Sequence, residues 1–286
     1  MSRSVEATAP TSGSQLGSAR AGAGGAVPAT RGAALVRDPS PHLAAGIVTH
    51  VARTPVDVDL ARAQHAAYVA ALSAHGWRPV PAGDGDPHPD GVFVEDTAVV
   101  VDDLAVLTRP GAEERRGEVG AVQEALGALG LQLARIPAPA TLDGGDVLQV
   151  GRTVYVGRGG RTNADGVRRL RSLLAPLGRV VVPVALRGVL HLKSAVTALP
   201  DGTLLGLPHL VDAGGLPSMR TPPEPEGAHV VPLGGAGLLL SASAPRTAEW
   251  LDDLGFDVTI VEIGEFEKLE GCVTCLSVLL PGVSAR

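Results

Sequence analysis

Cysteine is nearly absent from this chain of 286 residues, which has two, Cys272 and Cys275. Two cysteines so close together provide no disulfide framework for a chain of this length, so we expect a reducing compartment and predict a cytoplasmic protein. Their spacing is that of a zinc or redox motif. A zinc site needs about four ligands, however, and no second close Cys or His pair supplies the rest, so no metal is expected.

Long apolar runs and positive charge are also lacking. No apolar stretch approaches the roughly 20 residues of a membrane span, and the N-terminus has no apolar core of the kind found in secretory signals. The formal net charge is −6, from 24 basic and 30 acidic residues. Nucleic acids and anionic membranes require a basic face, so we exclude both as partners. A small molecule remains, and the charge is compatible with a cationic one.

Most of the chain has the composition of a folded protein. Hydrophobic residues make up 45% of it, which is enough for a sizeable core. Residues 1–33 differ, because they are mostly Ala, Gly, Ser, Thr and Pro and bury too little apolar surface to offset their ordering entropy. We predict a disordered tail over 1–33 and a single folded domain over 34–286.

A repeat runs through the folded region. Four times a helical pattern ends at a glycine and a short apolar strand follows, which is a typical signal of a helix end. The stretch 230–241 reads as β structure and predicts a fifth unit whose helix is degenerate. The helical stretches are 59–75, 119–129, 162–177 and 245–254, and the glycines are Gly76, Gly130, Gly178 and Gly255.

Each repeat also carries a polar motif that leads into a β segment, and three of these segments have tight-turn candidates at 102–103, 151–152 and 200–202. Alternating strands and helices would normally indicate a doubly wound sheet, but repeated units with hairpins indicate blades around a pseudosymmetry axis. We therefore predict an α/β fold of ββαβ-type repeats whose motifs meet at one central site. The motifs are 93–96, 142–146, 190–194 and 271–275.

Cys275 and His191 occupy the same position in two of these repeats. A thiolate is a strong nucleophile, but a free cysteine has a pKa of about 8.5 and needs a cationic neighbour to ionise at neutral pH. His191 could be that neighbour, or it could protonate a leaving group. A lone cysteine before an apolar strand is more often a core residue, so the prediction depends on the shared repeat position. Cys272 is predicted to be a packing residue.

Paired acids interrupt an apolar run at Glu95 and Asp96, where uncompensated charge is costly unless a cation arrives. A guanidinium is such a cation, because it is planar and forms bidentate contacts with carboxylates. Asp90 adds a third acceptor, and solvated acids at a strand end are the alternative interpretation.

Arg115 and Arg161 follow glycine-containing loops, where either could bind a carboxylate, although arginine is common throughout this chain.

Together and in this order, the motifs resemble those of dimethylarginine dimethylaminohydrolases, members of the guanidino-group-modifying superfamily with the pentein fold. The resemblance covers about 35–280. It implies a five-bladed pseudosymmetric α/β propeller in a single catalytic domain. It also implies hydrolysis of methylated arginines to citrulline and dimethylamine or methylamine, without metal or organic cofactor. The segments that carry it are 93–96, 108–116, 141–147, 161–163, 190–193 and 274–277.

The resemblance further implies roles for individual residues. Cys275 would be the nucleophile that forms a covalent thiouronium, and His191 the general acid and base, oriented by Asp143. A homodimer is compatible with the sequence. The implied substrate-binding residues are Asp90, Glu95 and Asp96 for the guanidinium, Arg115 and Arg161 for the α-carboxylate, and Ile47 for an apolar contact in an active-site lid at 41–47.

Other functions stay open at this point. An arginine deiminase or an amidinotransferase-like enzyme on the same fold would use the same Cys, His and acid set. A non-catalytic scaffold would need no paired acids beside a cysteine. A redox or zinc protein built on Cys272 and Cys275 is less favoured, because a dithiol motif usually precedes a helix and 276–280 reads as a strand.

Overall fold

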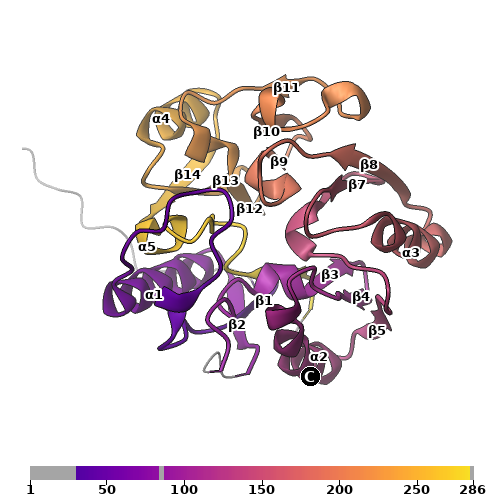
Figure 1. Ribbon diagram of the computed structural model, residues 1–286. Coiled ribbons are helices and arrows are strands. Elements are labelled where there is room, and N and C mark those ends of the chain that lie inside the picture. The colour runs from indigo at the N-terminus through magenta and orange to yellow at the C-terminus, as the bar shows by residue number, and fades with distance from the viewer. Residues whose placement is uncertain (1–29, 84–86, 284–286) are drawn as a thin grey trace, which may run out of the picture.

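The computed structural model describes residues 30–83 and 87–283. Within them, five three-stranded sheets surround a central axis like the blades of a propeller (Figure 1). Most of the predicted tail, residues 1–29, lies outside the described residues. The first strand begins at Gly32, two residues before the predicted start of the folded domain at 34, and Ala33 is fully buried.

All five sheets share one pattern. The first strand of each sheet runs antiparallel to the second, and the second runs parallel to the third. The sheets are β15 (Val278–Pro281), β1 (Gly32–Val36) and β2 (Trp77–Pro81); β3 (Ala98–Val101), β4 (Leu104–Leu107) and β5 (Gln132–Arg135); β6 (Val147–Val150), β7 (Thr153–Arg158) and β8 (Val180–Ala185); β9 (Val196–Ala198), β10 (Leu204–Gly206) and β11 (Met219–Arg220); and β12 (Val230–Gly234), β13 (Gly237–Ser241) and β14 (Asp257–Val261).

Four of the blades place an α-helix between their second and third strands, on the outer side of the ring (Figure 1). Asp57 and Asn163 cap the first and third helices through their side chains, and the predicted Gly255 follows the fourth with a φ of 90°. The predicted helices are therefore confirmed. They are α1 (Val58–Ala74), α2 (Val119–Ala128), α3 (Ala164–Leu174) and α4 (Pro245–Asp253), with a short α5 (Gly264–Glu267) before the last motif.

The unit with the degenerate helix is not the one that was predicted. The stretch 230–241 forms β12 and β13, which α4 and β14 complete as a regular blade. The unit without an α-helix is instead β9, β10 and β11, where one-turn 3₁₀ helices at Pro208–Leu210 and Ala213–Gly215 connect the last two strands. Proline and paired glycines in this connection explain why no longer helix forms.

The polar motifs lie at equivalent ends of the innermost strands, as predicted. Short 3₁₀ helices at Val94–Thr97, Gly144–Asp146 and Leu192–Ser194 precede β3, β6 and β9, and a turn at 272–275 precedes β15. A fourth 3₁₀ helix of this kind, Pro225–Ala228, precedes β12 in the same way. The fold thus directs one motif from each blade towards the axis.

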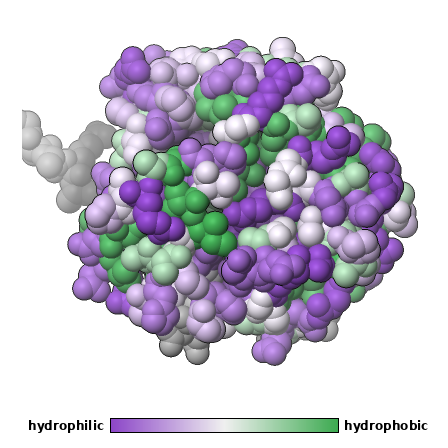
Figure 2. Space-filling view, in the orientation of Figure 1, coloured by the Kyte–Doolittle hydropathy of each residue, from purple (hydrophilic) through white to green (hydrophobic). Residues whose placement is uncertain are grey.

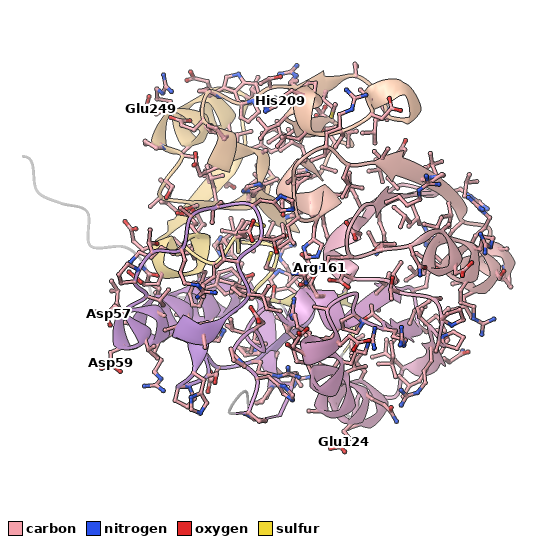
Figure 3. All side chains as sticks on the ribbon, viewed as in Figure 1. Asp57, Asp59, Glu124, Arg161, His209 and Glu249 are labelled. Atoms are coloured by element: carbon pink, nitrogen blue, oxygen red, sulfur yellow. The ribbon has the colours of Figure 1, made fainter. Side chains whose placement is uncertain are left out.

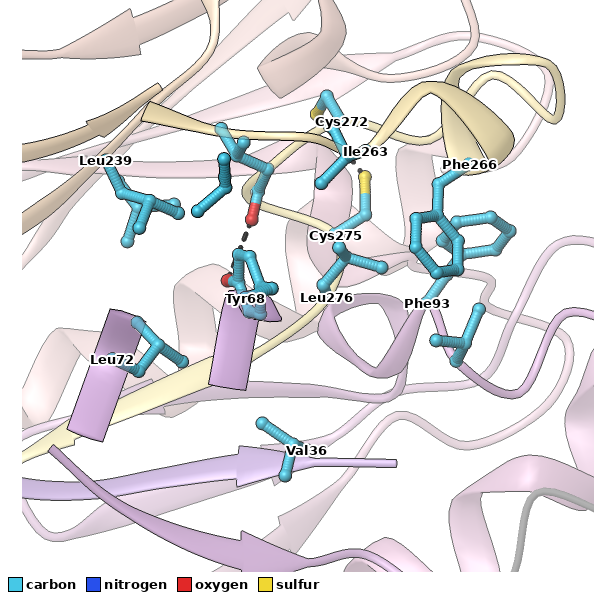
Figure 4. Packing of buried hydrophobic residues seen from close by; sticks show 14 of the residues in the cluster. Val36, Tyr68, Leu72, Phe93, Leu239, Ile263, Phe266, Cys272, Cys275 and Leu276 are labelled. Atoms are coloured by element: carbon cyan, nitrogen blue, oxygen red, sulfur yellow. Dashed lines mark hydrogen bonds between the residues drawn. The ribbon is translucent and has the colours of Figure 1, made fainter. Parts of the chain in front are cut away.

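Apolar clusters join neighbouring blades. Leu35 and Leu280 of the first sheet pack in one cluster with Leu107 and Val119 of the next blade, and all four side chains are buried. Another cluster packs α1 and α5 against the turn at 272–275 (Figure 4). The ring is therefore held by continuous apolar packing. Among the described residues, no helix is both long and apolar enough to cross a membrane.

Candidate active site

A small cavity of about 20 Å³ lies where the motifs converge. Hydrophilic residues gather near the middle of this face, with an apolar strip beside them (Figure 2), and Arg161 lies near the centre of the ring (Figure 3). Seven of the nine predicted site residues line the cavity, so the structure brings together side chains from distant parts of the sequence. They are Cys275, His191, Asp90, Asp96, Arg115, Arg161 and Ile47.

The other two predicted residues lie just behind the cavity. Asp143 is fully buried, and its Oδ2 is 3.1 Å from Nε2 of His191. Its Oδ1 accepts a hydrogen bond of 2.8 Å from the backbone N–H of Gly111, which fixes the carboxylate. Glu95 faces a different, larger cavity and is described below.

His191 is held between acids. Besides Asp143 on Nε2, its Nδ1 lies 3.8 Å from Oδ1 of Asp96. Burial disfavours the imidazolium, but the negative charges of Asp96, Asp143 and Asp146 outweigh it and raise the pKa of His191 to about 9. The ring is therefore protonated near neutral pH. Gly145 makes this packing possible, because a Cβ there would lie 2.8 Å from Nδ1 of His191.

Asp96 is the most strongly stabilised carboxylate of the site. Burial opposes its ionisation, but the charges of His191 and Arg115 and a hydrogen bond from the N–H of Gly145 hold its pKa well below the usual range. Asp90 behaves differently, because burial raises its pKa despite nearby Arg115. Two acids with opposite shifts thus line one cavity.

Arg115 makes more protein contacts than a substrate anchor would need. Its Nη1 donates to Asp96 at 2.5 Å, its Nε and Nη2 donate to Glu118, and its Nη2 also lies within hydrogen-bonding distance of the carbonyls of Asp90 and Phe93. The guanidinium therefore fixes Asp96 and the loop before it. Most of its N–H donors are already used, so few remain for the predicted contact with a substrate carboxylate.

Arg161 has the opposite character. Its side chain is 11% exposed, and its Nη1 is buried without a hydrogen-bond partner in the described structure, 3.6 Å from Oδ2 of Asp143. A buried guanidinium nitrogen without a partner is costly, so the position favours an incoming anion.

The Glu95 carboxylate has two protein partners. Nζ of Lys193 donates to it at 2.6 Å, and Oγ1 of Thr274 donates at 2.9 Å. Burial raises the pKa of Glu95 to about 7, although Lys193 opposes the shift. Lys193 lies within the sequence motif 190–194 and had no predicted role. Its signal was its rarity, as one of two lysines in the chain.

Glu95 and Lys193 line a second cavity of about 310 Å³ on the inner strands. Most of its wall is aliphatic and comes from the innermost strands of the five blades, β3, β6, β9, β12 and β15. Cys275, His191 and Arg161 line the small cavity instead, so we treat the small cavity as the candidate active site.

Cys275 lies beside the other cysteine. Its Sγ is 3.4 Å from Sγ of Cys272, and both side chains are buried. The contact with Cys272, burial and the negative charges of Glu95 and Asp96 raise the pKa of the Cys275 thiol. The thiol is therefore expected to be neutral until a cation enters the acid cluster.

A segment at 41–53, here called the lid, contributes Ile47 to the wall of the small cavity. The Ile47 N–H donates to both oxygens of Asp90, at 3.0 and 3.2 Å. The N–H groups of Thr49 and His50 donate to the carboxylate of Glu270, at 2.5 and 2.8 Å. Glu270 was not among the predicted site residues; it directly precedes the motif 271–275 and has a φ of 61°.

One group of described residues has the geometry of a metal site. The ligand atoms of Asp96, Asp143 and His191 lie within 4.8 Å of one another. Each acid already accepts hydrogen bonds or faces a cation, with Arg115 on Asp96 and Arg161 near Asp143. These contacts explain the cluster as a hydrogen-bonded support for His191.

No family model matches the chain. Over 248 residues the chain is 59% identical to the N(G),N(G)-dimethylarginine dimethylaminohydrolase of Streptomyces coelicolor. The alignment covers 86% of this chain and 96% of the relative. Two solved structures of dimethylarginine dimethylaminohydrolases match at 31% identity, covering 88% of this chain and 100% of theirs. One is a Pseudomonas aeruginosa cysteine-to-serine variant complexed with citrulline, with a TM-score of 0.79. The other is an adduct with S-methyl-L-thiocitrulline, with a TM-score of 0.80. The predicted five-bladed propeller is confirmed.

Proposed function

The chain belongs to the dimethylarginine dimethylaminohydrolase family, and from this premise we propose that it hydrolyses N-omega-methylated arginines to citrulline and dimethylamine or methylamine. The observation that carries the proposal for this site is the shared cavity of Cys275, His191, Asp90 and Asp96. A nucleophile, an acid and two carboxylates for a cationic group are the parts that such a hydrolysis requires.

Substrate placement follows from the charges. We propose that Asp90 and Asp96 hold the guanidinium, with Glu95 as a third acid behind them. Arg161 receives the α-carboxylate, which supplies the missing partner of its buried Nη1. We assign Arg115 to the support of Asp96, because most of its donors contact protein acceptors.

The first chemical step uses the charge that the substrate brings. A guanidinium in the acid cluster favours the Cys275 thiolate, whose ionisation the unbound site opposes. The thiolate attacks the guanidinium carbon, and a tetrahedral intermediate forms. His191, protonated near neutral pH, donates a proton to the departing dimethylamine. The C–N bond breaks, and a covalent thiouronium remains on Cys275.

The second step regenerates the enzyme. The now neutral His191 takes a proton from a water molecule, and the oxygen attacks the thiouronium carbon. The C–S bond then breaks, which releases citrulline and returns the thiol. Asp143 keeps Nε2 of His191 in place through both proton transfers.

The lid has to move for substrate to enter. A cavity of about 20 Å³ has room for about one water molecule and is too small for an amino acid. We propose that the lid opens to admit substrate and closes with Ile47 against it. A closed lid would keep bulk water away from the thiouronium until the amine has left the cavity.

Location and assembly are parts of the same proposal. We propose a cytoplasmic enzyme, because both cysteines are free and one of them has to stay reduced for catalysis. All the proposed site residues come from one chain, so a homodimer would be compatible with activity without being required for it.

The test is citrulline release with identification of the amine. Wild type, Cys275→Ser and Cys272→Ser would be given asymmetric dimethylarginine and arginine in parallel. We expect citrulline and dimethylamine from wild type, no turnover by Cys275→Ser, and activity close to wild type in Cys272→Ser, whose thiol is a packing group.

Each other result has its own meaning. Citrulline and ammonia from arginine would make the protein a deiminase on the same fold. Full activity in Cys275→Ser would remove the nucleophile assignment. Loss of activity in a well-folded Cys272→Ser would show that the second thiol takes part in the reaction.

A further inference from the structure

We propose that Cys272 and Cys275 form a reversible disulfide when a hydroperoxide reaches the active site, and that this bond switches the enzyme off. The functional part of the proposal rests on the assignment of Cys275 as the nucleophile. The covalent part rests on the geometry of the two thiols alone.

The two sulfur atoms are already in contact. Their separation is 3.4 Å, and Figure 4 shows the side chains of Cys272 and Cys275 beside each other. The N–H of Cys275 donates to the carbonyl of Cys272 at 3.0 Å, which closes a tight turn. The ends of such a turn have Cα atoms less than about 7 Å apart, close to the window of about 4.4–6.8 Å in which disulfides form. A bond therefore needs side-chain rotation and little backbone movement.

The environments of the two thiols give them different roles. Cys275 lines the small cavity and is reached by any small molecule that enters it. Both thiols pack in the same apolar cluster, but Cys272 is not among the residues that line this cavity. A hydrogen bond from the Cys275 thiol, the charge of His229 and a contact with Thr274 lower the pKa of Cys272. Cys275 is thus placed to meet the oxidant, and Cys272 to resolve the product.

The chemistry balances with one equivalent of hydroperoxide. The Cys275 sulfur attacks a peroxide oxygen, the O–O bond breaks, and the departing oxygen takes the thiol proton, which leaves a sulfenic acid and water or an alcohol. The Cys272 thiolate then attacks the sulfenic sulfur, the S–O bond breaks, and the hydroxide leaves with a proton as water. With hydrogen peroxide the sum is two thiols and one peroxide giving one disulfide and two waters.

Two consequences follow for the enzyme. The disulfide removes the lone nucleophile of the proposed reaction, so turnover stops. It also stops Cys275 from being oxidised to sulfinic or sulfonic acid, which thiols do not reverse. A small dithiol or monothiol reductant restores both thiols by exchange.

The experiment compares full-length wild type with Cys272→Ser and Cys272→Ala. Each protein is treated with hydrogen peroxide, and its intact mass and its activity before and after dithiothreitol are measured. The chain has two cysteines, so a loss of two hydrogens identifies this disulfide. Trypsin cleaves after Lys268 and leaves both cysteines in one peptide, in which alkylation shows whether they are free.

We expect wild type to lose two hydrogens together with its activity, and to regain most of that activity with dithiothreitol. After the same peroxide treatment, both Cys272 variants should gain oxygen on Cys275. With dithiothreitol they should regain at least about tenfold less activity than wild type. Wild type that gains oxygen and forms no disulfide, so that its unoxidised thiols can still be alkylated, would overturn the proposal. Equal recovery of activity in all three proteins would also overturn it. The mass change is read without turnover, so a failure of the proposed function is recognised separately.

Discussion

Arg161 has a buried guanidinium nitrogen, Nη1, that lies near Asp143 but makes no hydrogen bond, which makes Arg161 the best single residue for a binding test. We predict that Arg161→Ala raises KM about ten- to hundredfold, because a charge-assisted contact is worth about 1.5–3 kcal/mol. The fall in kcat should be smaller, since Arg161 does not touch the reacting carbon in this scheme. Steady-state kinetics with asymmetric dimethylarginine measures both.

Arg152→Ala is the matched control for this prediction, because its guanidinium contacts the carbonyl of Gly178 on the exposed side of a blade. Its kinetics should equal those of wild type. An unchanged KM together with a large fall in kcat in Arg161→Ala would contradict the carboxylate role.

His191 predicts the pH dependence of the reaction. Its imidazolium is stabilised by the surrounding acids, so kcat/KM should fall as pH rises through about 9 and the ring loses its proton. Asp143→Asn removes one of these negative charges and should move the alkaline limb to lower pH. The control Asp103→Asn, at an exposed turn, should leave the limb in place. An alkaline limb that stays fixed in Asp143→Asn would contradict the pairing.

The same pKa shift bears on stability. A raised histidine pKa stabilises the folded protein most below the unfolded value of about 6.5 and loses this contribution as pH rises through about 9. Urea unfolding of wild type and His191→Gln over this range would measure it. The free-energy difference between the two proteins should shrink as pH increases.

Single residues of the site were predictable to different degrees from the sequence. Cys275 and His191 were found because the repeat gives them one position, and Glu95 and Asp96 because paired charges in an apolar run need a compensating cation. Lys193 had no such pattern, since its partner Glu95 is distant in sequence and is adjacent only in the folded ring. Pairings across the axis are not encoded in local spacing.

At the scale of elements, the lid depends on one carboxylate outside it. Glu270 accepts from two lid N–H groups, so Glu270→Gln should weaken the closed lid. We expect trypsin to cleave after Arg53, within the lid, several-fold faster in this variant, and citrulline to slow the cleavage. Glu267→Gln is the matched control, because Glu267 binds Ser241 and Ser243 away from the lid. Equal cleavage rates in both variants would contradict the latch.

The helices were predictable because each ends at a glycine and most begin at a capping or proline residue. The unit with the degenerate helix was predicted at 230–241, one blade later than the blade of β9, β10 and β11 where it occurs. The connection between β10 and β11 has no helical period in the sequence, so it reads as a loop. Only the pairing of β10 with β11, set by contacts between segments more than ten residues apart, shows that this loop completes a blade.

At the scale of the whole molecule, shared apolar clusters predict a single unfolding transition. Leu280→Ala in the closing sheet and Leu170→Ala in α3 both remove a fully buried side chain, at a cost of about 2–5 kcal/mol each. We expect both to shift one common urea midpoint, followed by Trp fluorescence and circular dichroism. Leu133→Ala, at a 40% exposed side chain, should shift it little. Two separated transitions would indicate blades that unfold independently.

The ring is closed by β15, which pairs with β1, and Cys275 lies directly before this strand. This order has a consequence during translation. A nascent chain that has not yet reached the closing strand has the acids and the histidine but no thiol, and its β1 has an unpaired edge. Chains that terminate early are therefore expected to be chemically silent and open to proteases. Guanidine chemistry would begin only when the closing strand has left the ribosome and paired with β1.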